Sequence, residues 1–92
     1  MTPIAAHIQY LRNIKGYSEN TCMAYEKALH KFVRSVRSAR PDATWSTITR
    51  RDIDLFILTL RNKGTHASSI NLYLSAISSQ YKFFFREGLK VD

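Results

Sequence analysis

The chain has 92 residues, of which 45% are hydrophobic, so its length fits one domain and its composition argues against an intrinsically disordered polypeptide. It carries 14 Lys and Arg against 7 Asp and Glu, a formal net charge of +7. This excess of positive charge favours a polyanionic partner, with nucleic acid as the first choice and an anionic membrane surface as the second.

Cysteine usage and hydropathy exclude several other classes. Cys22 is the only cysteine, so an intramolecular disulfide cannot form, which fits a reducing compartment. The N-terminus lacks a basic segment followed by an apolar stretch, so no signal peptide is expected. No run approaches the roughly 18 apolar residues that a membrane span requires.

A first helix is expected from residue 3 to residue 15. Thr2 can cap its N-terminus, Pro3 suits the first helical position, and Gly16 suits a left-handed stop. Apolar residues at helical spacing form its expected buried stripe: Ile4, Ile8, Leu11 and Ile14.

A second helix is expected after Ser18, running to about residue 38. One side of it collects the expected core residues, which are Cys22, Tyr25, Leu29, Phe32, Val33 and Val36. The roughly opposite side collects Lys27, Lys31 and Arg34, at positions i, i+4 and i+7. The sequence therefore predicts an amphipathic helix with a basic outer ridge.

A loop containing Pro41 separates this helix from a third, and Trp45 is expected to pack back onto the core. Thr49 and Asp52 have the spacing of a capping box at the start of the third helix, and Gly64 is expected to end it. Its expected inner face consists of Ile53, Phe56, Ile57 and Leu60.

The fourth helix is expected to begin after Thr65 and to run to about residue 87, with Gly88 as its stop. Its expected core stripe is Ile70, Leu74, Ile77, Tyr81 and Phe84, and its expected polar face is Asn71, Ser75, Ser79, Lys82 and Arg86. A second apolar stripe consists of Leu72, Ala76 and Phe83, and the pattern leaves open whether it is core or an interface. Four helices and no strand alternation predict an all-α four-helix bundle.

No constellation of residues indicates catalysis, a metal or a cofactor. His7, His30 and His66 fall on different expected elements and have no companion cysteine at ligand spacing. The serines lack the strand-to-helix elbow of a nucleophile, and there is no glycine-rich phosphate loop. We therefore expect a binding module with no cofactor, no metal and no small-molecule ligand.

Three segments together resemble the N-terminal core-binding domain of phage integrases and other tyrosine recombinases. The segments are YLRNIKGYSENTCMAYEKALHKFV, ITRRDIDLFILTLRNKG and SSINLYLSAISSQYKFFFREG. The positions that carry the resemblance are Gly16, Tyr17, Ser18, Thr21, Tyr25, Phe32, Ile48, Thr49, Asp52, Ile53, Ser69, Ile70, Asn71, Leu74, Ser75, Arg86, Glu87 and Gly88. The resemblance covers nearly the whole chain.

The resemblance implies a SAM-like four-helix domain, spanning residues 1–92, that clamps one side of a DNA core site. A separate C-terminal domain of the parent chain would carry the catalytic arginines, histidine and tyrosine, and the segment GLKVD would begin the linker to it. The implied partners are double-stranded DNA, that catalytic domain and other protomers on DNA, with no membrane. The implied location is the bacterial cytoplasm, and the fragment itself would not be an enzyme.

In the family the second and fourth helices face the DNA. The expected DNA-binding residues are therefore Thr21, Lys27, Lys31, Arg34, Ser69, Asn71, Ser75 and Lys82. Cations would pair with phosphates, whereas Asn71 could pair with an adenine edge. Ser78 stands where many relatives carry a cation, which shifts weight onto Lys82, and Gln80 stands where an aromatic residue is frequent.

A second function class remains open from the sequence. The chain could be a free-standing helical adaptor whose second apolar stripe binds protein and whose basic ridge is an ordinary solvated face. The two classes differ in salt response, because DNA binding releases counterions and weakens steeply as the salt concentration rises.

Overall fold

The computed structural model describes residues 1–88 and contains four helices in that range, with no strand. They are α1 (Pro3–Asn13), α2 (Glu19–Ala39), α3 (Arg50–Asn62) and α4 (Ala67–Glu87). This confirms the predicted all-α four-helix architecture. The expected start of an interdomain linker falls on residues 89–92, outside the described part of the chain.

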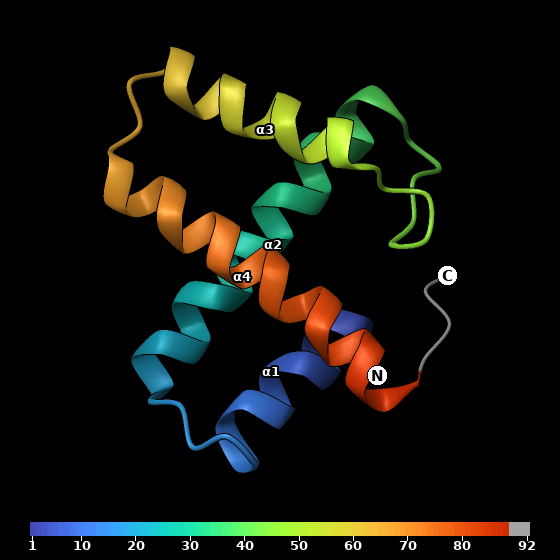
Figure 1. Cartoon of the computed structure of the whole chain (residues 1–92), viewed down its shortest axis with the longest axis vertical. Coiled ribbons are helices and arrows are strands. Elements are labelled where there is room, and N and C mark those ends of the chain that lie inside the picture. Colours follow the sequence, from blue (N-terminus) through green and yellow to red (C-terminus); the bar gives the residue numbers. More distant parts are fainter. Residues whose placement is uncertain (89–92) are drawn as a thin grey trace.

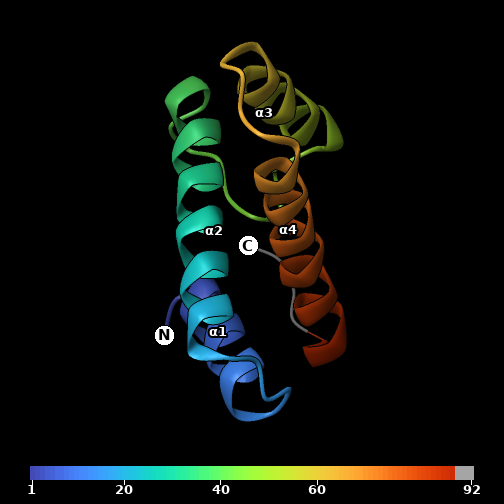
Figure 2. The same ribbon diagram turned by 90° about the vertical axis from the view of Figure 1, so that its left-hand side faces the viewer.

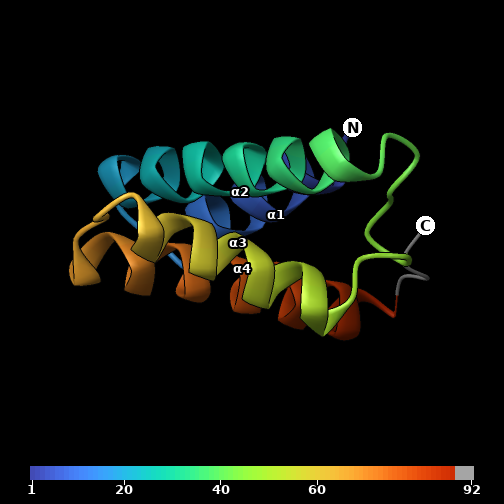
Figure 3. The ribbon, with the colours of Figure 1, turned by 90° about the horizontal axis from the view of Figure 1, so that it is seen from above.

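The two longest helices form the centre of the molecule. Figure 1 shows α4 crossing in front of α2, with α3 above the crossing and α1 below it. Seen from above, α1 and α2 form one layer and α3 and α4 form the other (Figure 3). From the side, the crossing helices α2 and α4 are seen as two separate layers (Figure 2). Both central helices therefore present one long side to the core and one to solvent.

Local capping explains where three of the helices start. The Thr2 side chain accepts from the Ala5 amide, and the Ser18 side chain accepts from the Thr21 amide. At α3 both halves of the predicted capping box are formed: Asp52 N–H donates to Thr49 Oγ1, and Thr49 N–H donates to Asp52 Oδ2. These bonds satisfy amide donors that have no partner inside the helix.

The core collects apolar side chains from every helix and from the loop between α2 and α3. Phe32 is fully buried, and its ring lies 5.3 Å from that of Phe56 and 6.2 Å from that of Trp45. Trp45 also packs against Tyr81 and Phe84 with centroid distances of 5.6 and 5.8 Å. The expected return of Trp45 to the core is confirmed.

The inner face of α4 differs from the predicted one. Leu74 is 40% exposed, whereas Ala76 and Gln80 are completely buried. The buried residues of α4 are Ile70, Ala76, Ile77, Gln80, Phe83 and Phe84. The prediction chose the most hydrophobic stripe, but α4 packs against α1 and α2, and its two completely buried side chains are a small residue and an amide. This rotated face also answers the question of the second stripe: Ala76 and Phe83 are core, and Leu72 is half-buried.

The end of α1 also departs from the prediction. The helix ends at Asn13 rather than at residue 15, and Ile14, expected in the buried stripe, is 69% exposed. The Lys15 amide donates to the Tyr10 carbonyl and the Tyr17 amide to the Leu11 carbonyl, so the chain already turns towards α2 there. No helix in the described residues is long and apolar enough to cross a membrane.

Candidate nucleic-acid interface

The predicted basic ridge of α2 borders a groove between α2 and α4. We call it the α2–α4 groove; its volume is about 580 Å³, and it is lined by Asn20, Met23, Ala24, Lys27, Ala28, Lys31, Arg34, Ser69, Leu72 and Tyr73. Four of the predicted DNA-binding residues therefore meet in one concave surface. They come from two helices that pack against each other where they cross (Figure 1).

The ridge faces solvent because the opposite side of α2 is buried in the core. Leu29 and Phe32 are fully buried, whereas Lys27, Lys31 and Arg34 are exposed. The three cations span about 10 Å along the helix axis. The Lys31 ammonium lies 5.7 Å from the Tyr73 ring centroid, a cation–π contact that turns this cation towards α4.

The outer side of α4 carries a polar stripe. Asn71, Ser75, Ser78 and Lys82 are all exposed and follow one another at i, i+4, i+7 and i+11. This spacing puts them in one row, about 16 Å long, on the face of α4 turned away from the core. Small polar side chains keep that row low, so the helix backbone could approach a nucleic-acid groove closely.

Ser79 does not belong to that outer row, although the sequence predicted it there. Its hydroxyl lies 2.7 Å from His7 Nε2, and His7 is completely buried between α1 and α4. Burial lowers the pKa of His7 to about 4, with the Gln80 side chain opposing the shift. His7 is therefore neutral at physiological pH, and the Ser79 hydroxyl is engaged in joining two helices.

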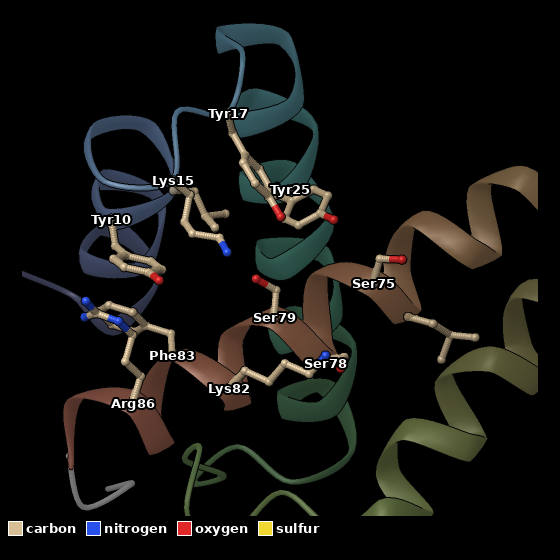
Figure 4. Close-up of a pocket in the computed structure, with 12 residues that line it drawn as sticks. Tyr10, Lys15, Tyr17, Tyr25, Ser75, Ser78, Ser79, Lys82, Phe83 and Arg86 are labelled. Carbon is tan, nitrogen blue, oxygen red and sulfur yellow. The ribbon is translucent and has the colours of Figure 1, made fainter.

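A second concave surface lies between α1, the start of α2 and the C-terminal half of α4. We call it the tyrosine pocket; its volume is about 640 Å³, and it is lined by Tyr10, Leu11, Lys15, Tyr17, Tyr25, Leu74, Ser75, Ser78, Ser79, Lys82, Phe83 and Arg86. Figure 4 shows Lys15, Tyr17, Tyr25 and Ser79 extending towards the same space. Ser75 and Lys82 are the two predicted DNA-binding residues that reach it.

Both surfaces are electropositive because acidic residues are excluded from them. None of the described residues that line the α2–α4 groove or the tyrosine pocket is acidic. Glu19 and Asp52 lie elsewhere and bind Arg12 and Arg40. The Arg12 guanidinium lowers the pKa of Glu19, and the hydrogen bond from the Thr49 amide, with a further contribution from Arg40, lowers that of Asp52. Of the cations that line the two concave surfaces, Lys15, Lys27, Lys31, Arg34 and Lys82 make no ion pair among the described residues.

The two remaining predicted DNA-binding residues, Thr21 and Asn71, line neither the α2–α4 groove nor the tyrosine pocket. Thr21 is half-buried in the first turn of α2, where its Oγ1 accepts from the Ser18 hydroxyl at 3.0 Å. Asn71 is exposed on the outer row of α4 and lines neither concave surface. Within residues 1–88 no three His, Cys, Asp or Glu side chains come together as metal ligands would.

Sequence reasoning missed Lys15, Tyr17 and Tyr25 as residues of a shared site. Lys15 was expected to be the last residue of the first helix, whereas α1 ends at Asn13, and Tyr25 lies on a side of α2 that was expected to be core. The Tyr25 side chain is half-buried, and its ring meets that of Tyr17 edge-on at 6.1 Å. Their nearness results from the turn between α1 and α2.

Comparison with known proteins identifies the class of this fold. Residues 4–88 match the family described as "Phage integrase, N-terminal SAM-like domain", and the chain belongs to that family. The family assignment agrees with the resemblance stated from the sequence.

Curated relatives are tyrosine recombinases. The chain is 32% identical over 80 residues to tyrosine recombinase XerD of Oceanobacillus iheyensis, a match that covers 87% of this chain and 27% of that protein. It is 32% identical over 89 residues to tyrosine recombinase XerC of Lactobacillus delbrueckii, covering 97% of this chain and 30% of that protein. The chain thus spans under a third of the length of these relatives. No solved structure matches it significantly.

Proposed function

We propose that this chain is the DNA-binding module of a tyrosine site-specific recombinase and clamps the DNA core site for a separate catalytic domain. The observation that carries the proposal is the cationic, acid-free surface that borders α2 and α4. Cation–phosphate pairing supplies most of the affinity in protein–DNA interfaces. Residues 1–92 would form one domain of the recombinase.

The proposed roles follow from position. The exposed cations of α2 contact phosphates along a groove wall, since a ridge of about 10 Å reaches neighbouring phosphates. The outer row of α4 enters the major groove, where Asn71 can donate and accept on an adenine edge. Ser69, Ser75 and Thr21 would add hydroxyl contacts to the backbone.

Replacing both Lys27 and Lys31 by Ala tests the basic ridge. Both side chains are exposed, so the free energy of unfolding should change by less than about 0.5 kcal/mol for each. Affinity for every duplex should fall alike, and the slope of log affinity against log salt should drop by about two units. Fluorescence anisotropy of labelled duplexes at several salt concentrations measures both.

The matched control removes two exposed cations, Arg50 and Arg51, at the start of α3. The slope should drop less in this variant, because these residues line neither concave surface. Equal salt slopes in the wild type and the double lysine variant would mean that the ridge contacts no phosphate and is an ordinary solvated face. A wild-type chain that binds no duplex at low salt would refute the proposed function.

Asn71→Ala tests base recognition separately. It should weaken binding to a duplex selected from a random pool more than binding to unselected DNA, because a lost base contact costs about 1–3 kcal/mol only at the right base. Equal losses on both duplexes would assign Asn71 to the backbone or to no contact.

The burial of the second apolar stripe argues against the alternative of a protein-binding adaptor. Its docking stripe included Ala76 and Phe83, and both are buried against the other helices. The module would act in the cytoplasm with the catalytic domain of the same parent chain and with other protomers on DNA. We expect the isolated chain to form no covalent adduct with DNA, which denaturing gel electrophoresis of a mixture with labelled duplex would check.

A further inference from the structure

In the described part of the chain, the tyrosine pocket is lined by several positively charged side chains and by no acidic one. Three cations, Lys15, Lys82 and Arg86, reach it from a turn and from α4. Lys15 and Lys82 make no ion pair among the described residues, whereas Arg86 binds Glu87 at 2.8 Å and covers the Tyr10 ring at 4.5 Å. Bringing like charges together around a concave surface raises its potential, and an anion in the pocket relieves their repulsion.

Neutral donors complete the surface. Tyr17 and Tyr25 point into the pocket from the α1–α2 turn and from α2 (Figure 4), and Ser75 and Ser78 of α4 belong to its lining. Burial raises the pKa of the Tyr25 hydroxyl, so it keeps its proton at physiological pH and can donate a hydrogen bond. Cations and hydroxyl donors are the groups that bind phosphate oxygens.

We propose that the tyrosine pocket holds a stretch of the phosphodiester backbone of one DNA strand, with Lys15 and Lys82 paired to its phosphates and the tyrosine hydroxyls donating to it. This inference rests on the proposed DNA-binding function and adds a second backbone site to the α2 ridge. A volume of about 640 Å³ exceeds what one inorganic anion fills and suits a sugar–phosphate segment.

The position of the pocket relative to α4 supports the same ligand. Ser75, Ser78 and Lys82 line the pocket and belong to the outer row that begins at Asn71. A strand whose bases meet Asn71 would reach the edge of the pocket at Ser75, about 6 Å further along the row, and could follow the row to Lys82. The pocket holds the backbone at one end of α4, and the ridge of α2 holds it on the side of the α2–α4 groove.

Lys15→Ala tests the charge and is compared with Arg51→Ala, which removes the same charge at the start of α3, outside both concave surfaces. Both side chains are exposed. Lys15→Ala should weaken duplex binding severalfold and lower the salt slope by about one unit, with a smaller change for Arg51→Ala. A double change of Tyr17 and Tyr25 to Phe should weaken binding at an unchanged slope, because neutral hydroxyls release no counterions.

Lys15→Cys gives a readout that does not depend on affinity. The native Cys22 is buried, so the new thiol is the accessible one. Duplex DNA should slow its alkylation by iodoacetamide, whereas the thiol of Arg51→Cys should react at the same rate with and without DNA. Inorganic phosphate at the same phosphate concentration should not protect Lys15→Cys.

The outcomes separate the two proposals. If the wild type binds DNA through Lys27 and Lys31 but Lys15 variants match their Arg51 controls in slope and alkylation, the pocket proposal fails and the proposed function stands. Equal protection by inorganic phosphate would also overturn it, because the pocket would then hold a free anion. If the wild type binds no duplex, both proposals fail together.

Discussion

Two regions hold α4 in place, and their chemistry is opposite. The aromatic cluster, formed by Phe32, Trp45, Phe56, Tyr73 and Phe84, joins α4 to α2, α3 and the loop before α3 through ring contacts of 5.2 to 6.2 Å. The polar seam, formed by His7, Ser79 and Gln80 with the Pro3 carbonyl, joins α4 to α1. One region stabilises by burying area, and the other by directional bonds in a buried place.

The polar seam has a cost that the aromatic cluster lacks. The Gln80 amide donates to the Pro3 carbonyl at 3.1 Å, but His7 Nδ1 and Gln80 Oε1 are buried without a hydrogen-bond partner of good geometry. Buried polar groups stabilise only when they are satisfied, so these two unpaired atoms lower the contribution of the polar seam to stability. The seam bears on the proposed function, because Ser79 and Phe83 of α4 and Tyr10 and Leu11 of α1 line the tyrosine pocket.

The largest expected effect comes from the aromatic cluster. Phe32→Ala should lower the free energy of unfolding by about 3–5 kcal/mol, since it removes a fully buried ring and leaves a cavity. Chemical denaturation followed by circular dichroism measures it. Phe85→Ala is the control, with about 0.5 kcal/mol or less expected for a ring that is 90% exposed. Similar losses in both variants would contradict the dominance of this cluster.

The next largest effect is the pH dependence of the free energy of unfolding, which the polar seam should cause through His7 and the aromatic cluster should not. The pKa of His7 falls from 6.5 in the unfolded chain to about 4 in the folded one, and its neighbours Ser79, Gln80 and Phe83 carry no charge. The unfolded chain therefore binds a proton first as pH falls, and the stability that neutral His7 confers is complete above pH 6.5 and is lost towards pH 4. At about 1.4 kcal/mol per pKa unit, the loss between pH 7 and pH 5 is about 2 kcal/mol.

Denaturation curves at pH 7, 6 and 5 check this pH dependence. The lowered pKa values of Asp52 and Glu19 act below about pH 4.5, outside that range. Exposed His30 is the control, and His30→Gln should keep the pH dependence while His7→Gln should remove most of it. A wild type equally stable at pH 7 and pH 5 would refute the buried, neutral state of His7.

A smaller effect is expected at the N-terminal cap of α3, the helix that contributes Phe56 to the aromatic cluster. Thr49→Ala should cost about 1 kcal/mol, because it removes the hydroxyl that accepts from the Asp52 amide. Thr49→Ser keeps that acceptor and should cost less. If thermal unfolding shows the same loss for both, the methyl group rather than the cap contributes the stability.

The smallest effect tests the register of α4 on which both regions depend. The sequence-predicted register puts Leu74 in the core and predicts a loss of about 2–5 kcal/mol for Leu74→Ala. Because Leu74 is 40% exposed, the expected loss is below about 1 kcal/mol. Leu29→Ala, at a fully buried position, should reach the larger range in the same urea titration. A loss of about 2 kcal/mol or more in the free energy of unfolding for Leu74→Ala would support the register predicted from the sequence and contradict the observed one.

Features with local causes were predictable from the sequence. The number of helices, the capping box of Thr49 and Asp52, and the exposure of Lys27 and Lys31 all follow from residues a few positions apart. Capping bonds and helical periodicity act over one or two turns, so they need no knowledge of neighbouring helices. The basic ridge, as a row of side chains, belongs to this group.

Only the tertiary structure decided which polar residues face inwards and which meet across helices. Gln80 is buried and Leu74 is exposed because the facing surfaces of α1 and α2, rather than hydrophobicity, select the inner side of α4. The tyrosine pocket unites Lys15, Tyr25 and Lys82, which are far apart in sequence and belong to a turn and two helices. No periodicity within one segment encodes such a meeting, because it depends on how the helices cross and where the chain turns.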